Sequence, residues 1–104
     1  MEIPIEKCPV EEAIRIIGGK WKLLVLRSLL LNGPQRYNDL LKTVSAISPK
    51  ELTRNLRELT STGLVARAAG SGIMVQYNLT ELGNGLMPTF EALLIWGKNL
   101  AAAG

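Results

Sequence analysis

Two helical segments in the middle of the chain are joined by a very short connection, and this junction is the strongest constraint on the fold. The first segment ends at Val44 and the second begins at Ser48, which leaves three residues between them. So short a connection makes the two helices cross at a steep angle, as they do in a helix-turn-helix. We therefore expect a helix-turn-helix over about residues 38–62.

The second of these segments has a well-defined helix start. Ser48 precedes Pro49, which suits the first helical position, and Glu51 follows at the third. The serine oxygen can accept a backbone N–H of the first turn, while the glutamate reaches back to the N–H of the serine. The sequence therefore predicts a helix start at Ser48, and Asn38 is the predicted cap of the first segment.

This second helix has two opposite faces. The apolar face consists of Leu52, Leu56 and Leu59. The basic face consists of Lys50, Arg54 and Arg57. On a helical wheel each set spans about 60°, and the centres of the two sets lie roughly 160° apart. We expect the leucines to pack on a core and the cations to point directly away from it.

The N-terminal third of the chain predicts two further helices. Pro9 suits the first position of a helix, and Gly18-Gly19 is a typical helix end. Residues 20–33 are apolar on most sides, which indicates a central helix.

The C-terminal part predicts a hairpin followed by a last helix. Residues 64–79 contain two β-prone runs around Gly70-Ser71-Gly72, a pattern typical of a hairpin, which in this position is a wing. We expect a dimerisation helix over about residues 80–101, interrupted in its first part by glycine and proline. The predicted fold class is mainly α with a small β hairpin, a winged helix-turn-helix.

Length and composition limit the classes of function. With 104 residues, we expect residues 1–104 to form a single winged helix-turn-helix domain. The chain has no histidine and one cysteine, so it cannot build a structural zinc site or a histidine-based triad. We expect no enzyme activity, no metal and no cofactor. The chain also has no apolar run that spans a bilayer and no secretory signal pattern, so we expect a cytoplasmic protein.

The positive charge of the chain is concentrated around the two-faced helix. Residues 36–67 carry six Lys or Arg against three Asp or Glu, and the rest carries six of each, so this segment holds the whole net charge of +3. A local excess of this kind is typical of a surface that binds a polyanion. A solvated surface is the plain alternative, but the winged helix-turn-helix favours double-stranded DNA, whose major groove accepts a helix.

The polar residues near such a groove then have expected roles. Arg54 is the candidate base reader, because arginine is the usual bidentate partner of guanine. Lys50 and Arg57 are candidates for phosphate contacts. Ser48 and Thr53 flank the basic face and can donate to phosphate. Arg36 and Arg67 lie where the flanking DNA backbone would pass.

The apolar residues near the two chain ends exceed what one stripe against a small core requires. One copy of the basic face also offers few phosphate contacts, so specific affinity calls for two copies on one duplex. We therefore expect a homodimer joined through the N- and C-terminal helices, unless these residues all close the monomer core. The predicted interface residues are Ile3, Ile5, Val10, Leu86, Phe90, Leu93, Leu94, Trp96 and Leu100.

A series of short motifs resembles the HxlR-type transcription regulators, a group related to the MarR-like winged helix proteins. The motifs are Cys8-Pro9-Val10, Gly18-Gly19-Lys20-Trp21, Ile47-Ser48-Pro49-Lys50, Leu52-Thr53, Leu56-Arg57-Glu58-Leu59, Gly63-Leu64-Val65, Tyr77-Asn78-Leu79-Thr80 and Leu82-Gly83. The resemblance covers nearly the whole chain and implies a cytoplasmic homodimer that binds a pseudo-palindromic operator and changes the transcription of nearby genes. The wing departs from the family pattern because its tip is short and neutral. We therefore expect Arg67 to be the only wing residue that contacts DNA.

The resemblance also implies a role for Cys8. In several HxlR-type proteins the cysteine before this proline senses electrophiles or oxidants. The residues themselves support this in part, because a helix N-terminus and Lys7 favour the thiolate, whereas Glu6, Glu11 and Glu12 disfavour it. Oxidation would either join the cysteines of two subunits or attach a small thiol. A buried, inert cysteine is the alternative.

The sequence leaves two alternatives, one for the partner of the basic face and one for the molecule that switches the protein. The basic face can instead meet an acidic protein partner, which makes the winged helix a protein-interaction module. The effector can be a small apolar molecule held between subunits near Trp21, Phe90 and Trp96, although these aromatic residues also suit a core.

Overall fold

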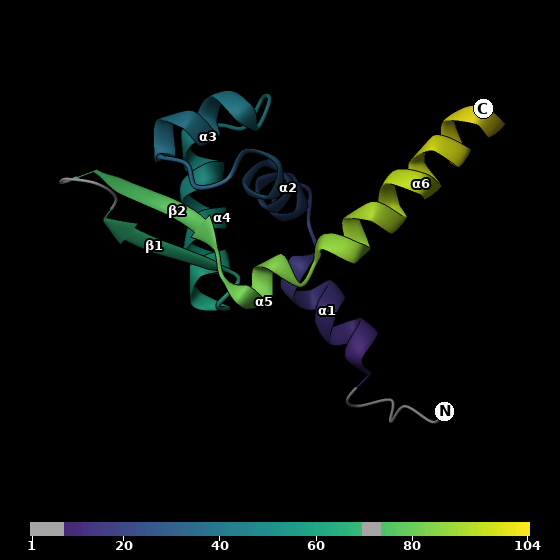
Figure 1. The fold of residues 1–104 in the computed structure, drawn as a ribbon, viewed down its shortest axis with the longest axis horizontal. Helices are drawn as coiled ribbons and strands as arrows, with labels where there is room; N and C mark the ends of the chain where they lie inside the picture. Colours follow the sequence, from purple (N-terminus) through teal and green to yellow (C-terminus); the bar gives the residue numbers. More distant parts are fainter. Residues whose placement is uncertain (1–7, 70–73) are drawn as a thin grey trace.

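The fold is mainly helical with one antiparallel hairpin, as the sequence predicts. A computed structural model describes residues 8–69 and 74–104, so the predicted turn at Gly70-Ser71-Gly72 and the predicted interface residues Ile3 and Ile5 lie outside the described residues. The elements follow in the order α1 (Pro9–Ile17), α2 (Lys22–Asn32), α3 (Tyr37–Thr43), α4 (Pro49–Ser61), β1 (Val65–Ala69), β2 (Val75–Leu79), α5 (Glu81–Asn84) and α6 (Met87–Ala103) (Figure 1).

The core forms where α2 meets the helix-turn-helix and the hairpin. Helix α2 contacts α3, α4 and β2, and it contributes Val25, Leu26 and Leu29 to the buried cluster. Trp21, directly before α2, is also buried there. The apolar character of residues 20–33 on most sides therefore reflects a helix that is covered from several directions.

The turn between α3 and α4 contains a residue in an unusual conformation. Ala46 has a φ of 69°, in the left-handed region that residues with a Cβ adopt rarely. The short turn leaves α3 and α4 in contact with each other, as expected of a helix-turn-helix.

The predicted cap of α3 is wrong. The N-cap is Arg36, and Asn38 lies inside the helix. The reason is Asp39, whose carboxylate accepts a hydrogen bond from the Arg36 backbone N–H at 3.1 Å and so fixes the helix start earlier in the chain.

The wing is a hairpin to which a short upstream segment adds a third partner. Strands β1 and β2 pair antiparallel, with Val65 opposite Leu79 and Arg67 opposite Tyr77. Gln35, between α2 and α3, exchanges two backbone hydrogen bonds with Tyr77, at 2.9 and 2.7 Å. This bridge fixes the base of the wing against the helix-turn-helix.

The Gln35 side chain also lies at the centre of a buried, hydrogen-bonded polar cluster that the sequence does not predict. Its amide nitrogen donates to the Ser28 carbonyl at 3.1 Å and to the Ser28 hydroxyl at 3.0 Å. Its amide oxygen accepts from the Thr43 hydroxyl at 2.8 Å, and Ser28 donates to Thr43 at 2.6 Å. Gln35 thus joins α2 and α3 through its side chain and the wing through its backbone.

Replacing Gln35 with leucine is expected to lower the free energy of unfolding by about 2–4 kcal/mol, because buried hydrogen-bonding groups of Ser28 and Thr43 lose their partner. Urea denaturation followed by circular dichroism measures the change. The substitution Asn38→Leu, at an exposed position of α3 outside the cluster, is the control, and equal stability of both variants would show that the cluster contributes nothing.

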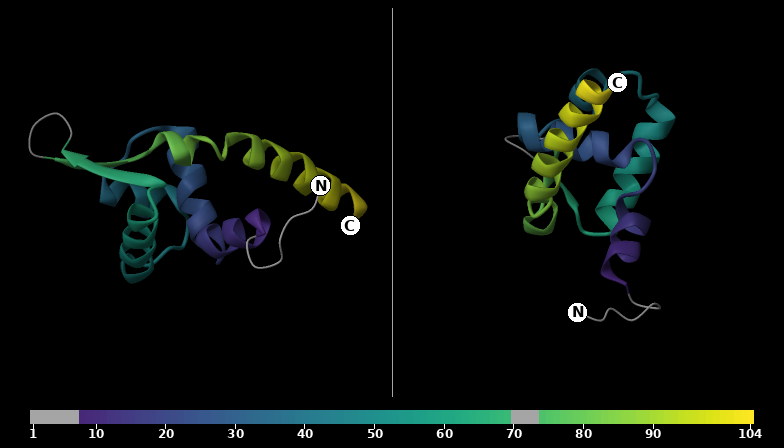
Figure 2. Two further views of the ribbon diagram at one scale, coloured as in Figure 1. Left: turned by 90° about the horizontal axis from the view of Figure 1, so that it is seen from below. Right: turned by 90° about the vertical axis from the view of Figure 1, so that its right-hand side faces the viewer.

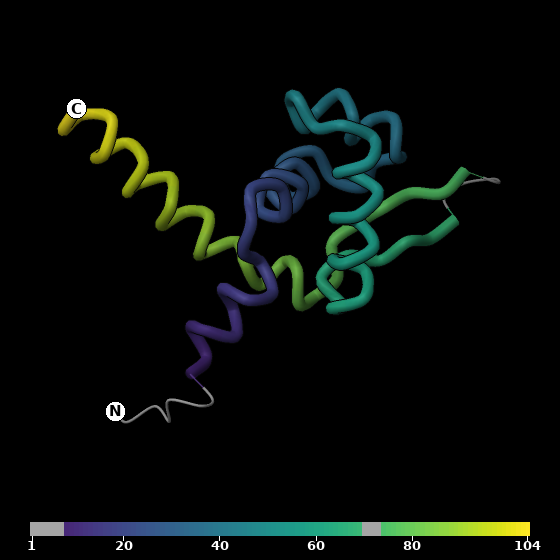
Figure 3. The backbone as a smooth tube through the Cα atoms, turned by 180° about the vertical axis from the view of Figure 1, so that it is seen from behind, coloured from purple at the N-terminus to yellow at the C-terminus, as the bar shows by residue number. Residues whose placement is uncertain are grey.

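The C-terminal region is divided, as its glycines and proline predict. Helix α5 ends at Asn84, and α6 begins at Met87. Gly83 is buried, and a Cβ there would lie 2.2 Å from the Leu64 carbonyl oxygen, so the close approach of α5 to the residue before β1 requires glycine. Helices α1 and α6 then diverge from the body on the side opposite the wing (Figures 1 and 3).

Candidate nucleic-acid interface

The N-terminus of α4 is held by the capping box that the sequence predicts. The Ser48 hydroxyl accepts from the Glu51 N–H at 3.1 Å, and the Glu51 carboxylate accepts from the Ser48 N–H at 3.2 Å. The other carboxylate oxygen accepts from Trp21 Nε1 at 2.5 Å. Glu51 therefore ties the start of α4 to the buried indole before α2, a link that was not predicted.

These contacts lower the pKa of Glu51 below its ordinary value, chiefly through the hydrogen bonds from Ser48 and then through Trp21 and the charge of Lys20. A carboxylate whose pKa is lowered by folding stabilises the folded protein at neutral pH. This contribution is lost as the pH falls below the ordinary pKa of 4.5 and through the lower pKa of the folded state.

The stability difference between the wild type and Glu51→Gln is accordingly expected to be largest near neutral pH and to shrink below about pH 4. Urea denaturation at several pH values measures it. Glu91→Gln, which removes an exposed carboxylate of α6, controls for the loss of one charge, and a constant difference for Glu51→Gln across this range would contradict the assignment.

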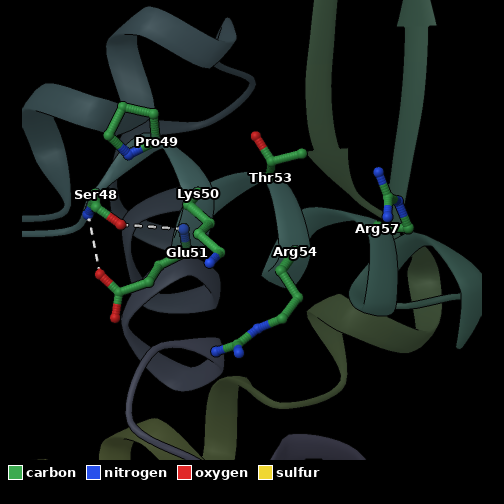
Figure 4. A pocket seen from close by; sticks show the side chains of 7 residues that line it. All are labelled: Ser48, Pro49, Lys50, Glu51, Thr53, Arg54 and Arg57. Atoms are coloured by element: carbon green, nitrogen blue, oxygen red, sulfur yellow. Dashed lines mark hydrogen bonds between the residues drawn. The ribbon is translucent and has the colours of Figure 1, made fainter.

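The two faces of α4 lie where the helical wheel places them. Leu52, Leu56 and Leu59 are buried in the core. Lys50, Arg54 and Arg57 are exposed and follow one another along the opposite side of the helix (Figure 4). The helix also buries Asn55, whose amide nitrogen donates to the Glu51 carbonyl at 2.7 Å. The core thus fixes the rotation of α4, and the rotation fixes the direction of the cations.

The cations of the basic face are not neutralised by neighbouring carboxylates. The ion pairs found in residues 8–69 and 74–104 are Glu12–Arg15, Lys22–Glu58 and Arg36–Asp39. None of them includes Lys50, Arg54 or Arg57. These three side chains line an open groove of about 820 Å³ together with Ser48, Pro49, Glu51 and Thr53. The charge of this face is therefore directed to whatever occupies the groove.

A second hollow lies between α4 and the wing and brings Arg67 close to the basic face. Arg57 and Arg67 both line this hollow, which has a volume of about 520 Å³. Hydroxyl groups of Thr60, Ser61 and Tyr77 share it, and none of these residues was predicted. Helical periodicity does not reveal them, because the hollow exists only once the hairpin is folded beside α4.

The remaining polar candidates differ in what they can still donate. Ser48 uses its oxygen as the helix cap, so its hydroxyl proton is free to donate. Arg36 is half-exposed and lies 3.7 Å from Asp39, at the start of α3. Thr53 is exposed on α4, and its hydroxyl contacts Tyr37 at 2.9 Å.

Cys8 lies away from the basic face. It is the N-cap residue of α1, makes no side-chain cap hydrogen bond and is partly buried. The acidic residues Glu11 and Glu12 occupy the first turn after it, and Glu12 pairs with Arg15.

The apolar ends of the chain leave a large surface uncovered. Helices α1 and α6 have no buried residue. Trp96 is 61% exposed and Val10 60%, and Leu93, Leu94 and Leu100 are also exposed, whereas Leu86 and Phe90 pack against the core. The alternative that all of these apolar residues close the monomer core is therefore wrong, because Val10 and most of the predicted interface residues of α6 are exposed.

The aromatic residues named for an apolar effector do not form one group. Trp21 is in the core and Trp96 is exposed on α6. Phe90 lines a groove of about 430 Å³ between α2 and α6.

Within the described ranges, no helix has both the length and the apolar character needed to cross a membrane.

Sequence comparison decides which family has this arrangement. Residues 16–103 match the HxlR-like helix-turn-helix family. The chain belongs to this family. The HxlR resemblance seen in the motifs is thereby confirmed, and so is the winged helix-turn-helix fold class.

Relatives of this HxlR-like protein are transcription regulators. An HTH-type transcriptional regulator of Methanothermobacter thermautotrophicus is 43% identical over 93 residues, which cover 88% of this chain and 70% of the relative. The reduced form of the transcriptional regulator YodB from B. subtilis is 29% identical with a TM-score of 0.82, covering 100% and 99% of the two chains. The reduced form of the redox regulator HypR is 34% identical with a TM-score of 0.78, covering 88% and 91%. The protein is therefore a transcription regulator of the HxlR type.

Proposed function

We propose that the protein is a cytoplasmic homodimer that binds a pseudo-palindromic DNA operator and regulates transcription from it, with all of residues 1–104 acting as one domain. The observation that carries this proposal is the orientation of α4. Its leucines are buried and its cations, free of carboxylate partners among the described residues, point away from the core. A helix of this kind fits the major groove.

The expected contacts follow the position of each residue. Arg54 reads a base, Lys50 and Arg57 contact phosphates, and Arg67 reaches the backbone that runs through the hollow between α4 and the wing. Arg36 and Ser48 add contacts at the starts of the two helices. Two subunits are needed because one α4 provides only a few of these contacts.

The salt dependence of DNA binding tests this proposal. A duplex from the DNA upstream of the protein's own gene is titrated with protein at several salt concentrations, and the logarithm of the affinity is expected to fall linearly with the logarithm of the salt concentration. Lys50→Ala should reduce this slope by about 1 per subunit, because one phosphate contact is lost. A flat salt dependence, or binding to no duplex at all, would leave an acidic protein as the partner of the basic face.

We also propose that Cys8 senses oxidants or electrophiles. The names of two solved relatives support this, since HypR is called a redox regulator and YodB was solved in its reduced form. The position of Cys8 at the start of α1, a helix whose apolar residues Val10 and Ile14 are exposed, supports it as well, because a change there can alter how two subunits pair.

Mild treatment with diamide is expected to change the operator affinity of the wild type several-fold and to leave Cys8→Ser unaffected, because only the thiol can form a disulfide with the partner subunit or with a small thiol. Fluorescence anisotropy with a labelled duplex measures both proteins. An identical response of the two would assign the switch to another part of the molecule.

A further inference from the structure

The hydroxyl of Thr53 belongs to a short chain of hydrogen bonds that runs back into the helix-turn-helix. Tyr37, at the start of α3, directs its phenol oxygen toward α4. This oxygen lies 2.8 Å from the Pro49 carbonyl oxygen and 2.9 Å from Thr53 Oγ1. Both contacts are short enough to be hydrogen bonds.

The number of protons decides the direction of these bonds. A phenol has one proton, and the Pro49 carbonyl can only accept, so the tyrosine proton goes to Pro49. The contact between Tyr37 and Thr53 is then a hydrogen bond only if the threonine donates. Tyr37 also occupies the carbonyl four residues before Thr53, which is the usual partner of a threonine hydroxyl in a helix.

The hydroxyl oxygen of Thr53 is consequently available to accept a hydrogen bond from a bound partner. Its proton is directed back to Tyr37, and its side chain is on the exposed side of α4, in the groove that Lys50, Arg54 and Arg57 also line (Figure 4). Among these four side chains it is the only one that can accept a hydrogen bond, because lysine and arginine have donors only.

From this geometry we propose that Thr53 selects a base pair that presents an amino group in the major groove, with Tyr37 as the positioning residue. The proposal rests on the proposed function, because it assigns base preference to the same DNA-binding helix. The amino groups available in the major groove are adenine N6 and cytosine N4, whereas guanine and thymine present acceptors there. Ser48 and Glu51 also line the groove, but their oxygens already accept the hydrogen bonds of the capping box and of Trp21, so the Thr53 oxygen is the one left to accept from such an amino group.

Selection from a pool of random duplexes tests the assignment. The wild type, Thr53→Val and Thr53→Ser are each used to select binding sites, which are then sequenced. The wild type and Thr53→Ser are expected to require adenine or cytosine at one position of each half-site, and Thr53→Val, which keeps the shape but has no acceptor, is expected to lose this preference and no other.

A second measurement removes the amino group from the DNA instead. Adenine is replaced by purine, or cytosine by pyrimidin-2-one, at the selected position. This change should weaken binding of the wild type by about 2- to 10-fold per half-site, as expected for the loss of one neutral hydrogen bond. The same change in the DNA should weaken binding of Thr53→Val by less. Equal losses for both proteins would overturn the proposal.

Other outcomes of the selection would also overturn it. If Thr53→Val loses a preference for guanine or thymine, the hydroxyl acts as a donor or the methyl group makes the contact. If Thr53→Val binds all sequences more weakly by the same factor, it contacts a phosphate. In both cases the wild type still binds an operator, so the proposed function stands, whereas a wild type that selects no sequence would overturn the function as well.

The variant Tyr37→Phe tests the positioning role separately. Without the phenol oxygen the Thr53 proton is free to turn outward, so guanine or thymine should become acceptable at the same position while the other positions keep their preference. An unchanged preference would remove Tyr37 from the proposal.

Discussion

Replacing Arg54 with alanine is expected to weaken operator binding between about 30-fold and about 25,000-fold. A bidentate contact from arginine to guanine contributes about 1–3 kcal/mol, and a dimer loses one contact in each half-site. The side chain is exposed near the middle of the basic face, and no described carboxylate pairs with it, so its donors are free for the base. Its backbone position is fixed by the buried leucines on the other side of α4.

Binding of Arg54→Ala to the operator and to a random duplex of equal length separates base reading from simple charge. The loss should be much larger on the operator than on the random duplex, because the base contact is specific. Arg54→Lys keeps the charge but not the planar fork, so it should bind random DNA normally and still lose preference for the operator. Arg15→Ala removes a charge on α1, away from α4, and controls for net charge. Equal losses on both duplexes would make Arg54 a phosphate contact.

The features predicted from the sequence are those that depend on residues close together in the chain. The capping box joins Ser48 to Glu51, and the two faces of α4 follow from a repeat of three and four residues. Such patterns indicate where a helix begins and which side is buried, whatever the rest of the fold is.

The features that were not predicted depend on contacts between distant residues. Trp21 and Glu51 are 30 positions apart, and Tyr37 and Thr53 are 16 apart. Gln35 is important because its side chain joins Ser28 to Thr43 and its backbone pairs with Tyr77 in the wing. No periodicity marks these pairs, because the crossing of α3 and α4 and the docking of the hairpin create them.

The wrong cap of α3 shows a limit of local patterns as well. Asn38 is a good cap by residue type, but Asp39 can serve the same helix from inside by reaching back to Arg36. Two local signals competed within three residues, and the carboxylate, which accepts a charge-assisted hydrogen bond, is the stronger one.

Replacing Trp96 with glutamate is expected to separate the subunits and to weaken operator binding by at least about 1000-fold, because a single α4 on DNA has little more than non-specific affinity. Trp96 is a large apolar side chain on a helix with no buried residue, and α6 extends away from the body in the views of Figures 1 and 2. Nothing within the described monomer explains why this helix is apolar on so much of its surface. We expect a second copy of α6 to pack against it, in line with the proposed homodimer.

The exposure of Trp96 also makes the experiment easy to interpret. Because the side chain contributes nothing to the buried cluster, Trp96→Glu should leave the circular dichroism spectrum and the folding of each subunit intact. Sedimentation equilibrium should then give the mass of one chain for Trp96→Glu and of two for the wild type. Met74→Glu, which places the same charge on an exposed apolar position beside β2, should stay dimeric. A dimeric Trp96→Glu protein would show that α6 does not form the interface, and the pairing of two basic faces on one duplex would then need another contact surface.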